Sequence, residues 1–96
     1  CMSTVVITGS GSGIGRAIAV MLADRDWTVV ATDVNEVAAA ETRELLSTAA
    51  GQTHVSRQLD VTNGDAAQAV ADEIADSLGL DAWVSNAGIS FMERFV

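Results

Sequence analysis

The glycine-rich segment Thr8–Gly15 is the feature that most constrains what this chain can fold into. It directly follows the β-branched run Thr4–Ile7, which is typical of a buried strand. The residues after it carry apolar side chains at helical spacing, namely Ile14, Ile18, Met21 and Leu22. A helix start offers unpaired N–H groups and a partial positive charge, and glycines let the backbone approach a ligand closely. The segment therefore predicts a phosphate-binding turn between a strand and a helix.

Size and charge limit the classes of function that the chain can serve. Its 96 residues make one domain at most, and 49% of them are hydrophobic, which argues against a disordered chain. The net charge of −8 argues against nucleic acid and against an anionic membrane surface as partners. We see no signal peptide and no apolar stretch of the roughly 18 residues that span a bilayer. With a single cysteine, these features predict a cytoplasmic protein.

The rest of the chain alternates between strand and helix patterns. We expect strands at 4–8, 27–32, 54–59 and 81–85. We expect a first helix at about 13–25. A second helix is expected to begin at a cap at Asn35 and run to about 49, with Gly51 ending it. A third is expected to begin at a capping box of Thr62 and Asp65, with Gly79 ending it. The strands are continuously apolar, as in sheets that are covered by helices on both faces. The pattern predicts an α/β fold with a doubly wound parallel sheet of four strands and three helices.

The pattern stops after the fourth strand, where only the segment 86–96 follows. The fourth strand, which carries Trp83, would then be an exposed sheet edge. We expect residues 1–96 to be the amino-terminal, dinucleotide-binding part of a single larger domain. Its first partner would be the carboxy-terminal remainder of the fold.

Polar and glycine residues follow each predicted strand at its carboxyl end. The glycine segment follows the first strand, Asp33 ends the second, Asp60–Val61 follow the third and Asn86–Gly88 follow the fourth. The carboxyl ends of parallel strands form one rim, where ligands bind in open α/β sheets. A carboxylate at Asp33 can accept hydrogen bonds from ribose hydroxyls. The rim therefore predicts a dinucleotide site.

These motifs together resemble the amino-terminal half of the classical short-chain dehydrogenase/reductase family, whose fold is Rossmann-type. The resemblance covers nearly the whole chain and rests on Thr8-Gly9-x-x-x-Gly13-x-Gly15, Asp33, Asp60 and Ser85-Asn86-Ala87-Gly88. It implies that Gly9, Ser12, Gly13 and Ile14 lie against the pyrophosphate and ribose of the cofactor. It further implies that Asp33 holds the adenosine ribose, that Asp60 and Val61 flank the adenine, and that Asn86, Ala87 and Gly88 pass beneath the nicotinamide ribose.

The resemblance implies an oxidoreductase that moves a hydride between a nicotinamide cofactor and a small carbonyl/alcohol substrate. We expect NAD rather than NADP, because Asp33 would repel a 2′-phosphate and positions 12, 32 and 34 are not basic. We also expect the complete enzyme to be a homo-oligomer. The one departure within the motifs is Ser85, where the family usually has Asn.

The catalytic residues of the family are an Asn, a Ser and a Tyr-x-x-x-Lys pair, all beyond the fourth strand. This chain contains no Tyr and no Lys, and nothing in the segment 86–96 matches them, so we expect no catalytic residue within it. The alternative interpretation is a non-catalytic nucleotide-binding module or an engineered fragment.

Other interpretations of single residues also remain open. Asp33 could cap a helix, and Asp60 could simply solvate a loop. We interpret His54 as an ordinary surface or sheet residue and expect no metal site, because no Cys or Glu cluster lies near it. Met21 is expected in the core and Trp83 in the core or an interface.

Overall fold

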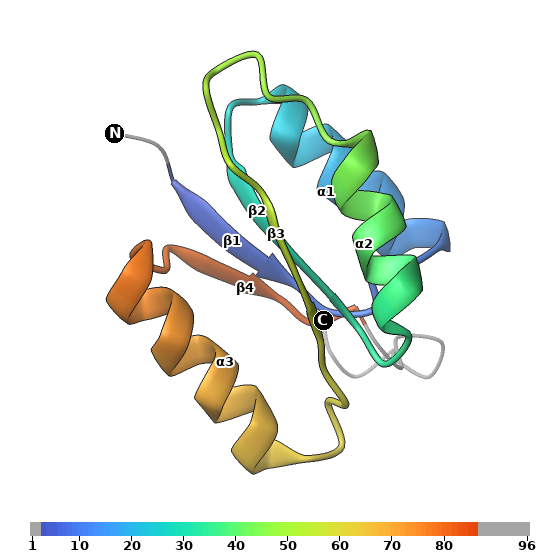
Figure 1. Ribbon diagram of the computed structural model, residues 1–96, viewed down its shortest axis with the longest axis vertical. Coiled ribbons are helices and arrows are strands. Elements are labelled where there is room, and N and C mark those ends of the chain that lie inside the picture. Colours follow the sequence, from blue (N-terminus) through green and yellow to red (C-terminus); the bar gives the residue numbers. More distant parts are fainter. Residues whose placement is uncertain (1–2, 87–96) are drawn as a thin grey trace.

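Strands and helices alternate strictly along the chain in the computed structural model, which describes residues 3–86 (Figure 1). The elements are β1 (Thr4–Ile7), α1 (Gly13–Asp24), β2 (Thr28–Asp33), α2 (Glu36–Leu45), β3 (Val55–Gln58), α3 (Gly64–Ser77) and β4 (Ala82–Val84). All seven expected elements are present in the expected order. Each lies within a few residues of its predicted range, apart from the early end of α2.

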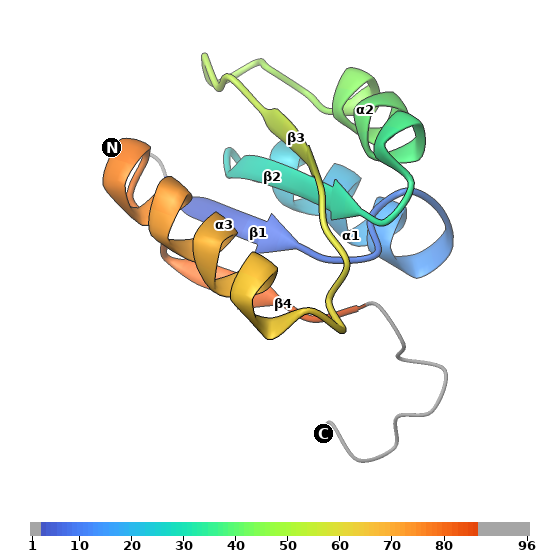
Figure 2. The same cartoon turned by 60° about the horizontal axis from the view of Figure 1, so that its bottom comes forward.

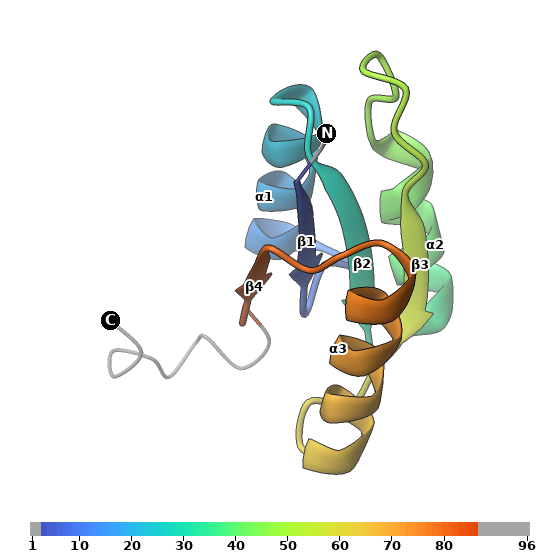
Figure 3. The ribbon, with the colours of Figure 1, turned by 90° about the vertical axis from the view of Figure 1, so that its left-hand side faces the viewer.

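The four strands form one parallel sheet in the order β3-β2-β1-β4, which Figure 3 shows from one side. In the register, Val5 lies beside Val29 of β2 and beside Ala82 of β4. The first strand is therefore central, and β3 and β4 are the two outer strands of the described sheet. The order reverses between β1 and β4, so the crevice at their carboxyl ends is the topological switch point of a doubly wound sheet.

Helices cover both faces of the sheet, with α1 and α2 on one face and α3 on the other (Figure 2). Beneath α1, the buried cluster consists of Val5, Ile7, Ala19, Ala23, Val29 and Leu46. Beneath α3, it consists of Val6, Val30, Leu59, Val70 and Ile74. Alternate residues of the central strands thus enter opposite cores, which explains why these strands are apolar without interruption.

Helix α1 packs through small residues rather than through Met21, contrary to our expectation. Its buried positions are Gly15, Ala19 and Ala23, spaced four residues apart, whereas Met21 is 46% exposed. Side chains four residues apart share one face of a helix, and small side chains on that face let the helix axis come close to the sheet. The close approach leaves the larger Met21 on the side of the helix away from the sheet.

Helix α2 ends at Leu45, earlier than expected, and Gly51 does not end it. Leu46 adopts an extended backbone conformation and is buried in the cluster beneath α1. The loop that follows is held by Gln52, whose side-chain amide donates hydrogen bonds to the carbonyls of Ala23 (2.9 Å) and Trp27 (3.2 Å). Burial of Leu46 and this anchored loop therefore set the end of the helix.

His54 is a buried structural residue and not a surface one, which corrects part of our expectation. It is 8% exposed, and its Nδ1 accepts a hydrogen bond from the backbone N–H of Val29 (3.0 Å). Its Nε2 lies 2.7 Å from the carbonyl oxygen of Ser47. A carbonyl oxygen can only accept, so Nε2 is the donor in this bond. His54 joins the loop after α2 to β2.

Helix α3 is capped by Asn63, which corrects the expected capping box of Thr62 and Asp65. The side-chain oxygen of Asn63 accepts a hydrogen bond from the N–H of Ala66 (3.1 Å). The hydroxyl of Thr62 instead donates to Asp60 (2.6 Å), and Thr62 lies one residue before the N-cap position. Gly79, with φ +78°, follows the last turn as expected. Among the helices of the described residues, none is long and apolar enough to cross a membrane.

Candidate dinucleotide site at the carboxyl rim

The predicted site residues of the described chain lie where the strands end at one edge of the parallel sheet. The glycine segment follows β1, Asp33 is the last residue of β2 and Asn86 follows β4. Asn86 is tied directly to the glycine segment, since its Nδ2 donates to the carbonyl of Gly9 (3.1 Å). Its backbone N–H donates to the hydroxyl of Thr8 (2.9 Å). Residues distant in sequence therefore build one continuous rim.

Two glycines of the segment have left-handed backbone conformations, Gly9 with φ +63° and Gly13 with φ +59°. Residues with a Cβ adopt such conformations only at a cost, so glycine is required at both turns. At Gly13, a Cβ would meet no atom of residues 3–86 within 4 Å. The structure thus leaves free space beside Gly13, directly at the start of α1.

The other two glycines are required by the protein's own packing. A Cβ at Gly15 would overlap the carbonyl oxygen of Gly9 and lie 2.6 Å from Nδ2 of Asn86. A Cβ at Gly11 would lie 2.6 Å from the Cβ of Ala38. Neither residue was among our predicted site residues. The glycine at 15 was visible in the motif, but the contact that demands glycine at 11 is tertiary and leaves no local signal.

The first turn of α1 keeps its N–H groups free of side-chain capping. Ser12 occupies the N-cap position with an extended backbone, but its side chain accepts no hydrogen bond from the turn. Ser12, Gly13 and Ile14 are all exposed. An uncapped helix start beside open space can receive an anion, because its N–H groups and dipole both favour negative charge.

Asp33 connects the end of β2 to the glycine segment. One carboxylate oxygen accepts a hydrogen bond from the N–H of Gly11 (2.9 Å), and the other accepts one from Asn35 (3.0 Å). The helix-capping alternative for Asp33 is answered by Asn35, which is the N-cap of α2 and accepts from Ala38. Each carboxylate oxygen has further lone pairs, so the ribose role remains chemically open to Asp33.

Asp60 and Val61 lie in the exposed loop after β3. Asp60 accepts hydrogen bonds from the hydroxyl (2.6 Å) and the backbone N–H (2.9 Å) of Thr62. The hydroxyl of Thr62, and then its backbone N–H, lower the pKa of the Asp60 carboxyl. The carboxylate therefore stabilises its own loop, and Val61 is 37% exposed.

Asn86 combines a structural role with an unused acceptor. Its side-chain nitrogen and backbone N–H are both bonded to the glycine segment, as described above. Its Oδ1 is buried and, among residues 3–86, finds no hydrogen-bond partner. A buried acceptor of this kind is costly unless a donor arrives. Ala87 and Gly88, the other predicted residues of this motif, lie outside the described residues.

A parallel sheet in the order 3-2-1-4, helices on both faces and a glycine turn at the switch point define the Rossmann-type class of proteins. A family model described as short chain dehydrogenase matches residues 3–96. The chain belongs to this family of oxidoreductases.

Individual relatives agree with this assignment. The chain is 41% identical over 86 residues to a 3beta-hydroxysteroid dehydrogenase of Mediterraneibacter gnavus, covering 88% of this chain and 31% of that protein. Menthone neomenthol reductase from Mentha piperita has a similar structure, with a TM-score of 0.79 and 36% identity over 91% of this chain and 32% of that one.

A short-chain dehydrogenase/reductase from Burkholderia phymatum in complex with NAD gives a TM-score of 0.76 with 38% identity, covering 85% of this chain and 29% of that one. The chain spans about a third of the length of the curated relatives it matches.

Among residues 3–86, no group of three or more His, Cys, Asp or Glu side chains could hold a metal ion. At the carboxyl rim, the described residues offer backbone N–H groups, a carboxylate at Asp33 and a buried amide oxygen at Asn86.

Proposed function

We propose that the protein is an NAD(H)-dependent oxidoreductase of a carbonyl/alcohol pair and that this chain supplies its cofactor-binding part. The observation that carries the proposal is the uncapped start of α1 at Ser12 and Gly13, which lies in the same rim as Asp33 and Asn86. In this proposal, residues 1–96 form the amino-terminal part of one larger Rossmann-type domain, and the protein works in the cytoplasm.

The residues of the rim fit a dinucleotide in both polarity and shape. Gly9, Ser12, Gly13 and Ile14 would lie along the pyrophosphate, where the N–H groups of α1 offset its charge. Asp33 would accept hydrogen bonds from the adenosine ribose. When bound, the nicotinamide accepts or supplies the hydride, and the protein orients the reacting groups.

The apolar side chains at the rim support an adenine position near Asp60. Ile14, Val34 and Val61 are 63%, 59% and 37% exposed, although each is a large hydrophobic residue. An aromatic base that covers them would remove apolar surface from water. Asn86, together with Ala87 and Gly88, would lie beneath the nicotinamide ribose, and the unpaired Oδ1 of Asn86 is suited to accept a hydrogen bond there.

Electrostatics at Asp33 favour NAD over NADP. A 2′-phosphate would lie beside this carboxylate, and no cation stands at positions 12, 32 or 34 to offset it. Thr32 is buried and its hydroxyl donates to the carbonyl of Ile7 (3.0 Å). Arg16 is engaged with the carbonyl of Gly11 and with Thr42.

The test is calorimetric measurement of the dissociation constants of NAD⁺ and NADP⁺ on the intact protein. We expect tighter binding of NAD⁺, and a shift of the preference towards NADP⁺ when Asp33→Ala is combined with Val34→Arg. Equal or tighter binding of NADP⁺ by the wild-type protein contradicts the cofactor assignment. The matched control is Val34→Ala alone, which keeps the carboxylate.

A second candidate function is a nucleotide-binding module without turnover, which is favoured by the absence of Tyr and Lys from this sequence. Intact mass of the natural protein separates the two. A polypeptide that continues with a Ser and a Tyr-x-x-x-Lys pair supports the enzyme, whereas a protein of this length supports the module. The relatives described above act on different substrates by name, so our proposal specifies only a carbonyl/alcohol pair.

A further inference from the structure

The backbone of the glycine segment is held by partners of the protein itself at Ser10 and Gly11. Their N–H groups donate to the carbonyl of Thr32 (2.9 Å) and to Oδ2 of Asp33 (2.9 Å). Their carbonyl oxygens accept hydrogen bonds from two side chains, Thr42 and Arg16, described next. The N–H and carbonyl groups of Ser10 and Gly11 are thus satisfied before any ligand arrives, which leaves ligand binding to the other residues of the segment.

The two carbonyls of Ser10 and Gly11 are bonded by side chains that are joined to each other. The hydroxyl of Thr42 donates to the carbonyl of Ser10 (2.6 Å), and Nη2 of Arg16 donates to the carbonyl of Gly11 (2.5 Å). The Nε of Arg16 in turn donates to the hydroxyl oxygen of Thr42 (2.8 Å). A hydroxyl has one proton, so accepting from Arg16 leaves that proton for Ser10.

The burial of Thr42 makes this pair a rigid support, while the Arg16 side chain is 31% exposed. Thr42 and Ser10 are both fully buried, and Thr42 lies on α2, whose packing against the sheet fixes its position. The Arg16 guanidinium, on α1, also lies 3.5 Å from the carbonyl of Ala38. Hydrogen bonds in such a connected, partly buried network strengthen one another. The pair therefore transmits the position of α2 to the glycine segment.

We propose that Arg16 and Thr42 are positioning residues that hold the glycine segment in its ligand-binding conformation. This inference rests on the proposed function, because the ligand is taken to be the dinucleotide. Their support keeps the backbone at Gly11 fixed, and with it the position of the uncapped start of α1 at Ser12 and Gly13. Without it, binding has to order the segment first, which weakens affinity.

Thr42, which carries no charge, separates the effect of positioning on affinity from the effect of charge. Loss of Arg16 removes a cation near an anionic ligand, and this alone weakens binding. Thr42→Val keeps both shape and charge but removes the donor to Ser10. If the pair acts by geometry, Thr42→Val and Arg16→Met each weaken NAD⁺ binding to the intact protein by about 5- to 30-fold, the effect of one or two lost hydrogen bonds.

Conservative variants and a double mutant sharpen the test. Thr42→Ser keeps the hydroxyl and should restore most of the affinity, whereas Arg16→Lys keeps the charge without the fork that reaches two oxygens and should not. Because the two side chains act through one network, the double variant should bind NAD⁺ about as weakly as the poorer single variant. Full additivity would contradict a shared role.

Amide hydrogen exchange measures the segment without any ligand. In Thr42→Val and Arg16→Met, the exchange of the Gly11 amide should accelerate, while the amides of Val6 and Val30 in the sheet stay as slow as in the wild-type protein. A general loss of stability would accelerate all three. Unchanged exchange of the Gly11 amide contradicts the inference even where affinity falls.

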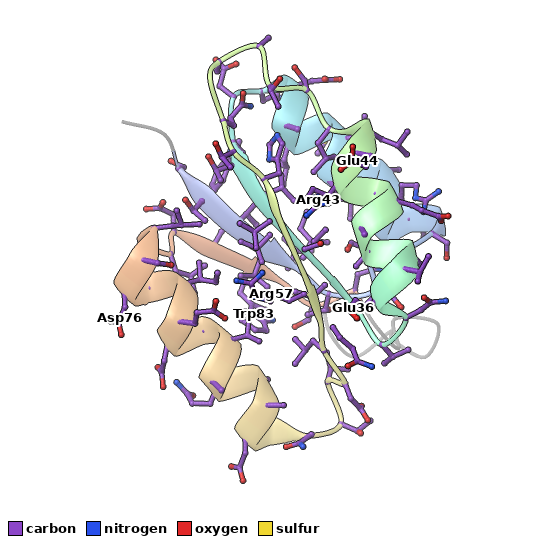
Figure 4. All side chains as sticks on the ribbon, viewed as in Figure 1. Glu36, Arg43, Glu44, Arg57, Asp76 and Trp83 are labelled. Atoms are coloured by element: carbon purple, nitrogen blue, oxygen red, sulfur yellow. The ribbon has the colours of Figure 1, made fainter. Side chains whose placement is uncertain are left out.

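Two matched controls carry the same substitutions away from the segment. Arg43→Met removes an α2 cation that pairs with Glu44 (3.1 Å), and both of these residues are labelled in Figure 4. Thr28→Val replaces a buried threonine at the opposite end of β2. Both should bind NAD⁺ as the wild-type protein does.

Wild-type affinity in Thr42→Val would overturn this inference alone. A wild-type protein that binds neither NAD⁺ nor NADP⁺ would overturn the proposed function and the inference with it.

Discussion

At the scale of single residues, the glycines of one short segment are present for different physical reasons. Gly11 and Gly15 are required because a Cβ would overlap neighbouring atoms of the protein. Gly13 needs glycine for its backbone angle, and among residues 3–86 no atom would lie within 4 Å of a Cβ placed there. Packing therefore accounts for the first two glycines, and backbone conformation accounts for Gly13.

Gly13→Val should abolish cofactor binding and leave the protein folded. A β-branched side chain would fill the open space beside the helix start, and its left-handed backbone angle would cost about 1–2 kcal/mol of stability. Calorimetry with NAD⁺ measures the affinity, and thermal unfolding measures the stability. The control is Gly64→Ala, at the start of α3, where a Cβ also meets open space but the ligand is not expected. Retained affinity in Gly13→Val would refute the assignment of the glycine segment.

Single-residue roles at the rim were predictable only in part. The spacing after each strand indicated which of the described residues stand at the rim, since strand ends follow from local patterns. It did not reveal that Asp33 bonds to Gly11 or that Arg16 and Thr42 support the same segment. These contacts join residues 5 to 32 positions apart through the packing of α1 and α2, which no local pattern encodes.

At the scale of elements, helices α2 and α3 have the same kind of N-terminal cap. Asn35 and Asn63 each stand at the N-cap, and each accepts a hydrogen bond from the N–H three residues later. At α2 this cap was predicted. At α3 we predicted a cap at Thr62 instead, and the structure shows that the hydroxyl of Thr62 donates a hydrogen bond to Asp60. Two adjacent capping residues cannot be ranked from sequence when a tertiary or turn partner competes for one of them.

Asn63→Ala should destabilise the protein by about 0.5–2 kcal/mol, because the first turn of α3 loses its side-chain acceptor. Urea unfolding of the intact protein measures the change. Thr62→Ala is the neighbouring control, and it should raise the pKa of Asp60 by removing the hydroxyl bond, as read from the carboxyl resonance in an NMR titration. A greater loss of stability in Thr62→Ala would reinstate the Thr62 capping box.

The ion pair between β3 and α3 should make stability depend on pH. Arg57 donates to both carboxylate oxygens of Glu73 (2.6 and 3.4 Å), and this bond lowers the pKa of Glu73. Because its pKa is lower in the folded than in the unfolded protein, the Glu73 carboxylate stabilises the fold at pH values above its unfolded pKa. This stabilisation is lost as the pH falls through the folded pKa. Glu73→Gln should therefore melt below the wild-type protein at neutral pH, with the difference closing as the pH falls through the lowered pKa of Glu73.

The matched control for that measurement is Asp76→Asn, which removes a carboxylate from the same helix (Figure 4). Asp76 stands near the carboxyl end of α3, where the helix dipole disfavours negative charge, so this variant should not melt lower at neutral pH. The same gap between Glu73→Gln and wild type at all pH values would show that the ion pair is not its cause.

At the scale of the whole molecule, the fold class was predictable because every level of the sequence agrees on it. Strand and helix patterns alternate, caps stand between them, and β-branched runs mark the buried central strands β1 and β2. The carboxyl end of α2 and the burial of His54 were not predictable, since both depend on a loop whose anchors are Ala23 and Val29 on other elements.

We expect residues 1–96 alone to show no dehydrogenase activity with any alcohol or carbonyl compound. The sequence holds no Tyr and no Lys, and its single histidine is buried and bonded to Val29 and Ser47. Formation of NADH, followed by its absorbance, is the assay, and mass spectrometry confirms that no longer protein is present. Turnover by this polypeptide would place proton transfer on residues within it.

The place of β1 at the centre of the sheet has a consequence for synthesis on the ribosome. Thr4, in β1, is joined by its backbone N–H to Asp81, 77 residues later, just before the strand that pairs on its other side. At about 5–20 residues per second, translation takes roughly 4–15 s to deliver that neighbour. During this interval one edge of an apolar strand has no strand beside it, and such edges invite pairing with other chains. The nascent protein is therefore most in need of chaperone protection before its fourth strand emerges.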